Sequence, residues 1–142
     1  MSQFAKIALL GALMLRPGVL DAQAKAWAEK LPHDFPGEFS DHWAGLIDDG
    51  TEALEATKDG ERIGLVLFKL DAAFTPPEFV IQGAFSPVNG AQLTEHLLPQ
   101  IEAIARARGC GTVRFHTMRA GLVAKAQSAG WRVSEVVMRK TL

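Results

Sequence analysis

The 142-residue chain has the composition of one soluble globular domain, with 48% hydrophobic and 22% charged residues. A formal net charge of −1 gives no indication of a nucleic-acid partner. The longest apolar run, Ile7–Leu15, is shorter than the roughly 20 residues that cross a bilayer. Cys110 is the only cysteine, so an intramolecular disulfide is excluded. We expect a single domain over residues 1–142, with no membrane partner.

Charge is distributed unevenly along this chain. Residues 1–105 hold 7 Lys/Arg and 15 Asp/Glu, whereas residues 106–142 hold 8 Lys/Arg and one acid, Glu135. Two interpretations stay open: a basic surface that binds cofactor phosphates or an acidic protein surface, or charge balance within one fold. The basic residues expected to gather at one end of a sheet are Arg106, Arg108, Arg114, Arg119, Lys125 and Arg132.

The N-terminal region is apolar and then amphipathic. Ile7–Leu15 is either a buried strand or a buried helix, and its periodicity does not choose between them. A sequence that resembles a signal-peptidase site, Ala22–Ala24, follows Arg16 and Asp21, which interrupt the approach to it. We therefore expect this region to stay in a mature, cytoplasmic protein. Helices are predicted over 19–31, with Leu20, Ala24 and Trp27 on one face, and over 41–48.

From Thr51 the pattern changes to strands. Residues 51–58 alternate loosely, Asp59-Gly60 is a hairpin signal, and 61–70 is apolar at nearly every position. This predicts an outer strand paired with a central one. The next strand, 78–85, is expected to lie antiparallel to 61–70.

An anion-binding arrangement is predicted next. The turn 86–91 joins strand 78–85 to an amphipathic helix over 92–108, and the free N–H groups and dipole of a helix start favour negative charge. Pro99 should kink this helix or delay its start until near Leu98. A strand over 112–118, parallel to 78–85 and separating from it at 83–85, a helix over 120–129 and a last strand over 131–138 complete the chain. The two helices, 92–108 and 120–129, are predicted on opposite faces of the sheet.

The predicted core consists of large apolar residues on the inward faces of these elements. They are Trp27, Trp43, Phe68, Phe79, Ile81, Ile101, Ile104, Phe115 and Val136.

This order of elements resembles the GCN5-related N-acetyltransferase (GNAT) family over about Thr51 to Lys140. The resemblance is clearest where the helix 122–129 leads to Gly130-Trp131 and then to Val136–Lys140. It implies an α/β (α+β) fold with a mixed, mostly antiparallel sheet and helices on both faces. It also implies acetyl-CoA as cofactor and transfer of an acetyl group to a small-molecule or protein amine.

The resemblance further implies that the turn after strand 78–85 holds the cofactor pyrophosphate on backbone N–H groups of an Arg/Gln-x-x-Gly-x-Gly/Ala loop. Only Gly90 matches the central glycine. Pro87, which has no N–H, stands at the Arg/Gln position, and Gln92 at the last small position. The residues that this implies for cofactor binding are Phe85, Ser86, Val88, Asn89, Gly90, Ala91 and Gln92.

Catalysis in this family uses a general base and a tyrosine that protonates the leaving thiolate. This chain has no tyrosine, and Ala126 stands at the matching position. Glu78 and Gln82 are candidates to polarise the amine through water, with ordinary structural roles as the alternative. His116 is a further candidate, and Ser128 or water could replace the tyrosine. The histidines show no metal-ligand spacing, so no metal is expected.

Two classes of function follow. The first is an acetyl-CoA-dependent N-acyltransferase. The second is a GNAT-like module without catalysis that binds a protein partner or forms a homo-oligomer, for example as a bacteriophage virion component. The missing tyrosine and the uneven charge favour the second class, and the order of elements favours the first.

Overall fold

The computed structural model describes residues 13–30, 50–85, 91–117, 120–136, 138 and 140–142. The predicted helix 41–48, Trp43 and most of the Ile7–Leu15 run lie outside these residues. The elements are β1 (Leu13–Pro17), α2 (Ala22–Lys30), β2 (Glu52–Lys58), β3 (Glu61–Asp71), β4 (Glu78–Phe85), α4 (Ala91–Ala107), β5 (Thr112–Phe115) and α5 (Ala120–Ser128).

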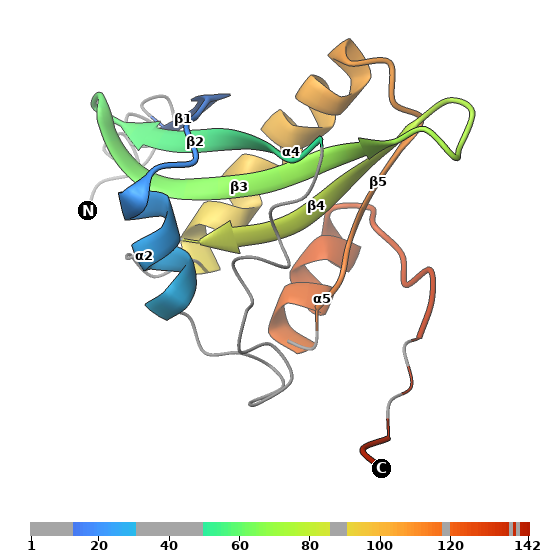
Figure 1. Ribbon diagram of the computed structural model, residues 1–142. Coiled ribbons are helices and arrows are strands. Elements are labelled where there is room, and N and C mark those ends of the chain that lie inside the picture. The colour runs from blue at the N-terminus through green and yellow to red at the C-terminus, as the bar shows by residue number, and fades with distance from the viewer. Residues whose placement is uncertain (1–12, 31–49, 86–90, 118–119, 137, 139) are drawn as a thin grey trace.

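The five strands form one mixed sheet in the order β1-β2-β3-β4-β5, with helices packed around it (Figure 1). All neighbours are antiparallel except β4 and β5, which are parallel. The predicted fold class is therefore confirmed. The hairpin between β2 and β3 turns at Asp59 and Gly60, both with positive φ, as an Asp-Gly pair permits. The prediction of β2 as an outer strand is wrong, because β1 pairs with its other edge.

The larger core lies between the sheet and α4, which runs behind the strands in Figure 1. Phe68 and Phe79 stack there with ring centroids 4.3 Å apart, and both are almost fully buried. Leu97 and Ile101 of α4 pack on them because they recur at helical spacing on one side of the helix.

The opposite face of the sheet carries α2 and a smaller core. Ala24 is fully buried against Leu65 and Leu67 of β3, and Trp27 packs on this cluster. Asp21 caps the helix, because its Oδ1 accepts a hydrogen bond from the Ala24 N–H at 2.9 Å. This cap explains why α2 begins at Ala22 and not at residue 19 as predicted.

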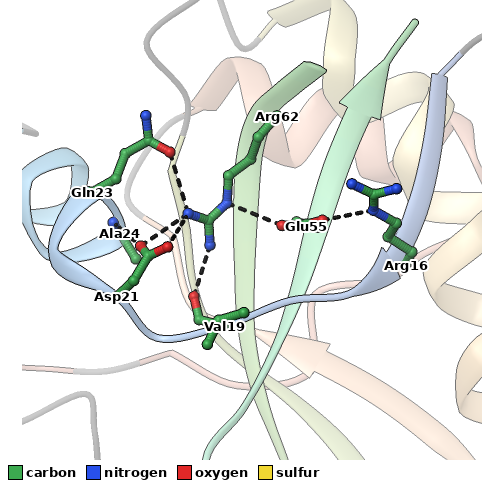
Figure 2. Close-up of polar contacts among 7 residues, drawn as sticks. All are labelled: Arg16, Val19, Asp21, Gln23, Ala24, Glu55 and Arg62. Atoms are coloured by element: carbon green, nitrogen blue, oxygen red, sulfur yellow. Dashed lines mark hydrogen bonds and ion pairs between the residues drawn. The ribbon is translucent and has the colours of Figure 1, made fainter. Parts of the chain in front are cut away.

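A network of ion pairs and hydrogen bonds connects the start of α2 to the sheet (Figure 2). Arg62 of β3 donates from Nη1 to both carboxylate oxygens of Asp21 at 2.9 Å, and from Nη2 to the Val19 carbonyl at 2.7 Å. Its Nε lies 3.2 Å from Glu55 Oε2, and Glu55 Oε1 in turn accepts from Arg16 Nε at 2.6 Å. Arg62 therefore links β2 to the start of α2, and Glu55 extends the network to Arg16 of β1.

Helix α4 begins directly at Ala91, so the predicted late start near Leu98 is wrong. Pro99 lies inside the helix. The next residue, Gln100, reaches β1: its Oε1 accepts from the Leu15 N–H at 2.9 Å and its Nε2 donates to the Leu13 carbonyl at 3.0 Å. A side-chain amide thus satisfies backbone groups of an edge strand that would otherwise be free to pair with another chain.

Both C-terminal helices end on the same glycine motif. Gly109 and Gly130 have φ of 79° and 90°, and the residue after each donates its N–H to a carbonyl five residues earlier, in the Schellman pattern. For α5 these are the Trp131 N–H and the Ala126 carbonyl, 3.0 Å apart. The cap therefore fixes where the chain leaves α5.

Two predictions about the C-terminal third are wrong. Helix α5 contacts α4, so these two helices do not lie on opposite faces; among the described helices, α2 lies opposite α4. The predicted strand 131–138 does not form over its described residues, and Val136 is 77% exposed where burial was predicted. Alternating apolar residues favour a strand only where the segment pairs with a neighbouring strand, and the described residues of 131–138 do not pair with β5.

The other core predictions are confirmed for three residues and only partly for four. Phe68, Phe79 and Ile101 are buried. Trp27, Ile81, Ile104 and Phe115 are half-buried. None of the described helices combines the length and apolar character that crossing a bilayer requires.

Candidate functional site

The parallel strands β4 and β5 pair at one end and separate at the other. Their ladder runs from Glu78↔Thr112 to Ile81↔Phe115, and β4 continues for four residues without β5. This agrees with the predicted separation near residues 83–85. We call the region beyond the last pair the opening.

A β-bulge marks the start of the opening. Leu67 faces Gly83 and Phe68 faces Ile81, so Gln82 is an extra residue on β4. A bulge bends its strand and re-aims the side chains that follow, which is a common feature next to binding sites. The sequence carries a faint signal for it, a Gln-Gly pair within an otherwise apolar strand.

The predicted cofactor turn follows the opening. Phe85 ends β4, and Ala91 and Gln92 are the first two residues of α4. Ser86, Val88, Asn89 and Gly90 lie outside the described residues. The first N–H groups of a helix have no partner within it and its dipole is positive at that end, so α4 begins with the electrostatics that a phosphate needs.

Gln82 and His116 occupy matching positions on β4 and after β5. Each is the first residue after the last β4–β5 pair, so they stand on the two sides of the opening. Gln82 Oε1 accepts a hydrogen bond from Thr51 Oγ1 at 3.1 Å, a partner that sequence analysis did not anticipate. His116 is exposed, and its Nε2 lies 3.7 Å from Glu135 Oε1.

Glu78 lies elsewhere. It starts β4, seven residues before Phe85, which at about 3.3 Å per residue places it roughly 23 Å from the turn. Its Oε2 accepts from Thr112 Oγ1 at 2.9 Å, and its Oε1 lies 3.1 Å from Arg114 Nε. Glu78 is an ion-pair partner at the end where β4 and β5 are paired. We therefore assign it a structural role and not the catalytic one.

The Ser128 hydroxyl is already hydrogen-bonded within its own helix. Its Oγ donates to the Ala124 carbonyl at 3.0 Å, one turn earlier in α5, and the side chain is exposed. Ala126, at the position of the missing tyrosine, is buried. The last turn of α5 therefore presents no free proton donor among these residues.

Part of the C-terminal positive charge is neutralised within the fold. Arg108 forms a two-pronged pair with Glu52, at 3.0 and 2.8 Å, and these hydrogen bonds lower the pKa of Glu52. Arg114 lies near three carboxylates, with Glu78 the nearest. Charge balance within one fold explains these two arginines; Arg119 lies outside the described residues.

In the part of the chain that the structure describes, no three His, Cys, Asp or Glu residues gather as metal ligands. Cys110 is half-buried after α4, and burial raises the pKa of its thiol.

Comparison of the fold with solved structures gives many acetyltransferases. An acetyltransferase from Trypanosoma brucei superposes with a TM-score of 0.62 at 20% identity, covering 92% of this chain and 99% of that one. The aminoglycoside 6'-N-acetyltransferase AAC(6')-IG from Acinetobacter haemolyticus gives 0.58 at 18%, covering 91% and 97%. AAC(6')-Iy, in complex with the bisubstrate analogue CoA-S-monomethyl-acetylneamine, gives 0.59 at 17%, covering 92% and 97%.

No protein-family model and no curated protein matches the sequence. The structural neighbours span nearly the whole of this chain, and their identities are low enough that the likeness shows the fold alone. On that basis the chain has the fold of the GNAT acetyltransferases.

Proposed function

We propose that the protein is an acetyl-CoA-dependent N-acetyltransferase that acts on an amine of a small molecule. One observation carries the proposal: β4 and β5 separate at a bulge, and α4 begins at Ala91, close in sequence to the end of β4 at Phe85. That arrangement gives an acyl chain a gap between strands and gives phosphates the start of a helix.

The residues at the opening have distinct roles in this proposal. Gln82, held by Thr51, would orient the acceptor amine by hydrogen bonding. His116 would take the proton that the amine loses as its nitrogen attacks the thioester carbonyl. The C–S bond then breaks, and we propose that water protonates the thiolate, since Ser128 is bonded to its own helix. The turn 86–90, with the first residues of α4, would bind the pyrophosphate.

The choice of a small-molecule acceptor is supported by what the structural neighbours bind. One neighbour was solved with sisomicin and another with a bisubstrate analogue of neamine. Both are polyamines, which suits an opening bordered by an amide and a histidine beside Glu135.

A thermal-shift assay with CoA tests the cofactor part of the proposal. Ligand at 100 times its dissociation constant stabilises a protein by about 2.7 kcal/mol, which such an assay resolves. Gly90→Asp should abolish the shift, because it adds a side chain and a negative charge where phosphate would sit. A matched variant at an exposed helical glycine, Gly121→Asp, should retain it.

Acetylation of an amine panel tests the chemistry. His116→Ala and Gln82→Ala should each lower kcat/KM, with about 10²-fold or more expected for a residue that moves a proton. Gln127→Ala, an exposed amide on α5, serves as the control. Absence of both a CoA shift and acetyl transfer would instead favour the non-catalytic module, with a protein partner, self-association or a virion role as its function.

A further inference from the structure

A hollow lies at the opposite end of the β4–β5 pair from the opening. Its volume is about 330 Å³, and its walls come from the last turns of α4, the start of β5 and the segment after α5. This volume is at the lower end of the range for pockets that hold small organic ligands. Six of the residues that line it are Ala105, Arg106, Val113, Trp131, Arg132 and Ser134.

Some charged side chains that line the hollow are paired with each other, and others could bind a ligand. Arg114 and Glu78 also line it, but they are paired with each other. Arg106 and Arg132 are exposed, and neither has an ion-pair partner among the described residues. Glu102 is the acid that remains on the wall. Two guanidinium groups without a carboxylate partner among the described residues therefore outnumber the one remaining carboxylate at the rim.

Neutral groups complete the walls. Cys110 adds no negative charge near neutral pH, because burial raises the pKa of its thiol. Ala105, Val113 and the indole of Trp131 are apolar. The Trp131 ring is held by Phe115, with centroids 5.1 Å apart, and its Nε1–H is buried without an acceptor among the described residues.

We propose that this hollow binds a small organic carboxylate, with the carboxylate between Arg106 and Arg132 and the apolar body against Val113 and Trp131. Guanidinium groups suit carboxylates because they donate parallel hydrogen bonds in a planar fork. An inorganic anion would neutralise the same charges and leave the apolar wall and most of the volume unfilled. The site is separate from the cofactor turn, so it does not depend on the proposed acetyl transfer.

Benzoate is a suitable probe, because it combines a carboxylate with an apolar ring of the right size. We expect calorimetry to detect benzoate binding at millimolar concentrations, and neutral benzamide to bind at least about tenfold more weakly, as loss of a charge-assisted contact implies. Arg132→Gln and Arg106→Gln should each weaken benzoate binding by about tenfold. Lys58→Gln, which removes a positive charge at the end of β2, should leave the affinity unchanged.

Fluorescence locates the bound probe. Benzoate should change the emission of Trp131 in the intact protein, and Trp131→Phe should remove that change while calorimetry still detects binding. Saturating CoA should not displace benzoate. The proposal is overturned by absence of binding at millimolar benzoate, by equal affinity for benzamide, by stronger binding of inorganic phosphate, by displacement with CoA, or by unchanged affinity in both arginine variants.

Discussion

The two faces of the sheet are stabilised by different physics. On the α4 face, large side chains such as Phe68, Phe79 and Ile101 are excluded from water over the length of a 17-residue helix. On the α2 face, the described residues form a 9-residue helix over a smaller core, and Arg62 holds the start of this helix through ion pairs and hydrogen bonds. The ion pair of Arg108 with Glu52 on the α4 side lies at the exposed rim of a larger apolar core.

The two faces are stabilised differently because their helices differ in length. A helix of nine residues is marginal by itself and offers few apolar side chains for burial. Capping by Asp21 and the hydrogen bonds of Arg62 compensate, and they do so through charges that pH and salt can alter. The α4 face should therefore respond mainly to changes in side-chain volume, and the α2 face mainly to changes in charge.

The largest effect is expected on the α4 face. Phe79→Ala removes a fully buried ring from its stack on Phe68 and should lower the free energy of unfolding by roughly 3–5 kcal/mol. Phe74→Ala, at a half-exposed ring in the loop before β4, should cost about 0.5 kcal/mol or less. Chemical denaturation measures both, and similar losses would show that the core has been placed on the wrong residues.

A smaller effect is expected at the fastening of α2. Arg62→Met should cost about 2 kcal/mol, because it leaves the Val19 carbonyl and the Asp21 carboxylate without this donor and removes one of the two ion-pair partners of Glu55. This loss should shrink as salt rises, whereas the loss in Phe79→Ala should not. Arg106→Met, at an exposed arginine, is the matched control and should change stability little. Equal salt dependence in the two destabilised variants would remove the distinction between the faces.

The smallest effect is a pH dependence from Asp21. The hydrogen bond from the Ala24 N–H, followed by those from Arg62, lowers the pKa of this carboxyl group below its ordinary value. A carboxyl group with a lowered pKa in the folded state stabilises the protein above its unfolded pKa, and this contribution is lost as the pH falls through the folded value. Asp21→Asn should therefore flatten the fall in stability below about pH 4.

Asp59→Asn is the control, because it also removes one carboxylate and asparagine tolerates the positive φ at this position. Its acid profile should follow that of the unaltered protein. An Asp21→Asn profile that also follows the unaltered protein would show that the first turn of α2 does not depend on this charge.

Local signals in the sequence predicted most of the elements. Strand β4 begins and ends as predicted, and α4 differs from its prediction by one residue at each end. Asp59-Gly60 produced the expected hairpin, and glycines end both C-terminal helices where expected. These features depend on neighbours within a few positions, which is why periodicity and turn residues report them.

The geometry around the candidate site was predicted in part. The opening between β4 and β5 lies where the resemblance to the GNAT family implied it, and Gln82 and His116 lie beside it. Glu78 was assigned to the same site from its strand alone, and pairing with Arg114 and Thr112 places it at the other end. The end of β4 at which the strands separate was predicted; the partners of Glu78 were not, because Thr112 and Arg114 lie more than 30 residues away in the chain.

The sequence alone determined the order of strands and helices from β2 to α5, the two helix ends at glycine, and the burial of the α4 stripe, because these follow from local propensity and from removing apolar area from water. Tertiary structure decided the bulge at Gln82, the contact of α5 with α4, the failure of 131–136 to pair, and the partners of Arg62, Arg108 and Arg114. Each of these joins residues far apart in the chain. Their energies depend on register and on distances of a few ångströms, which no local pattern encodes.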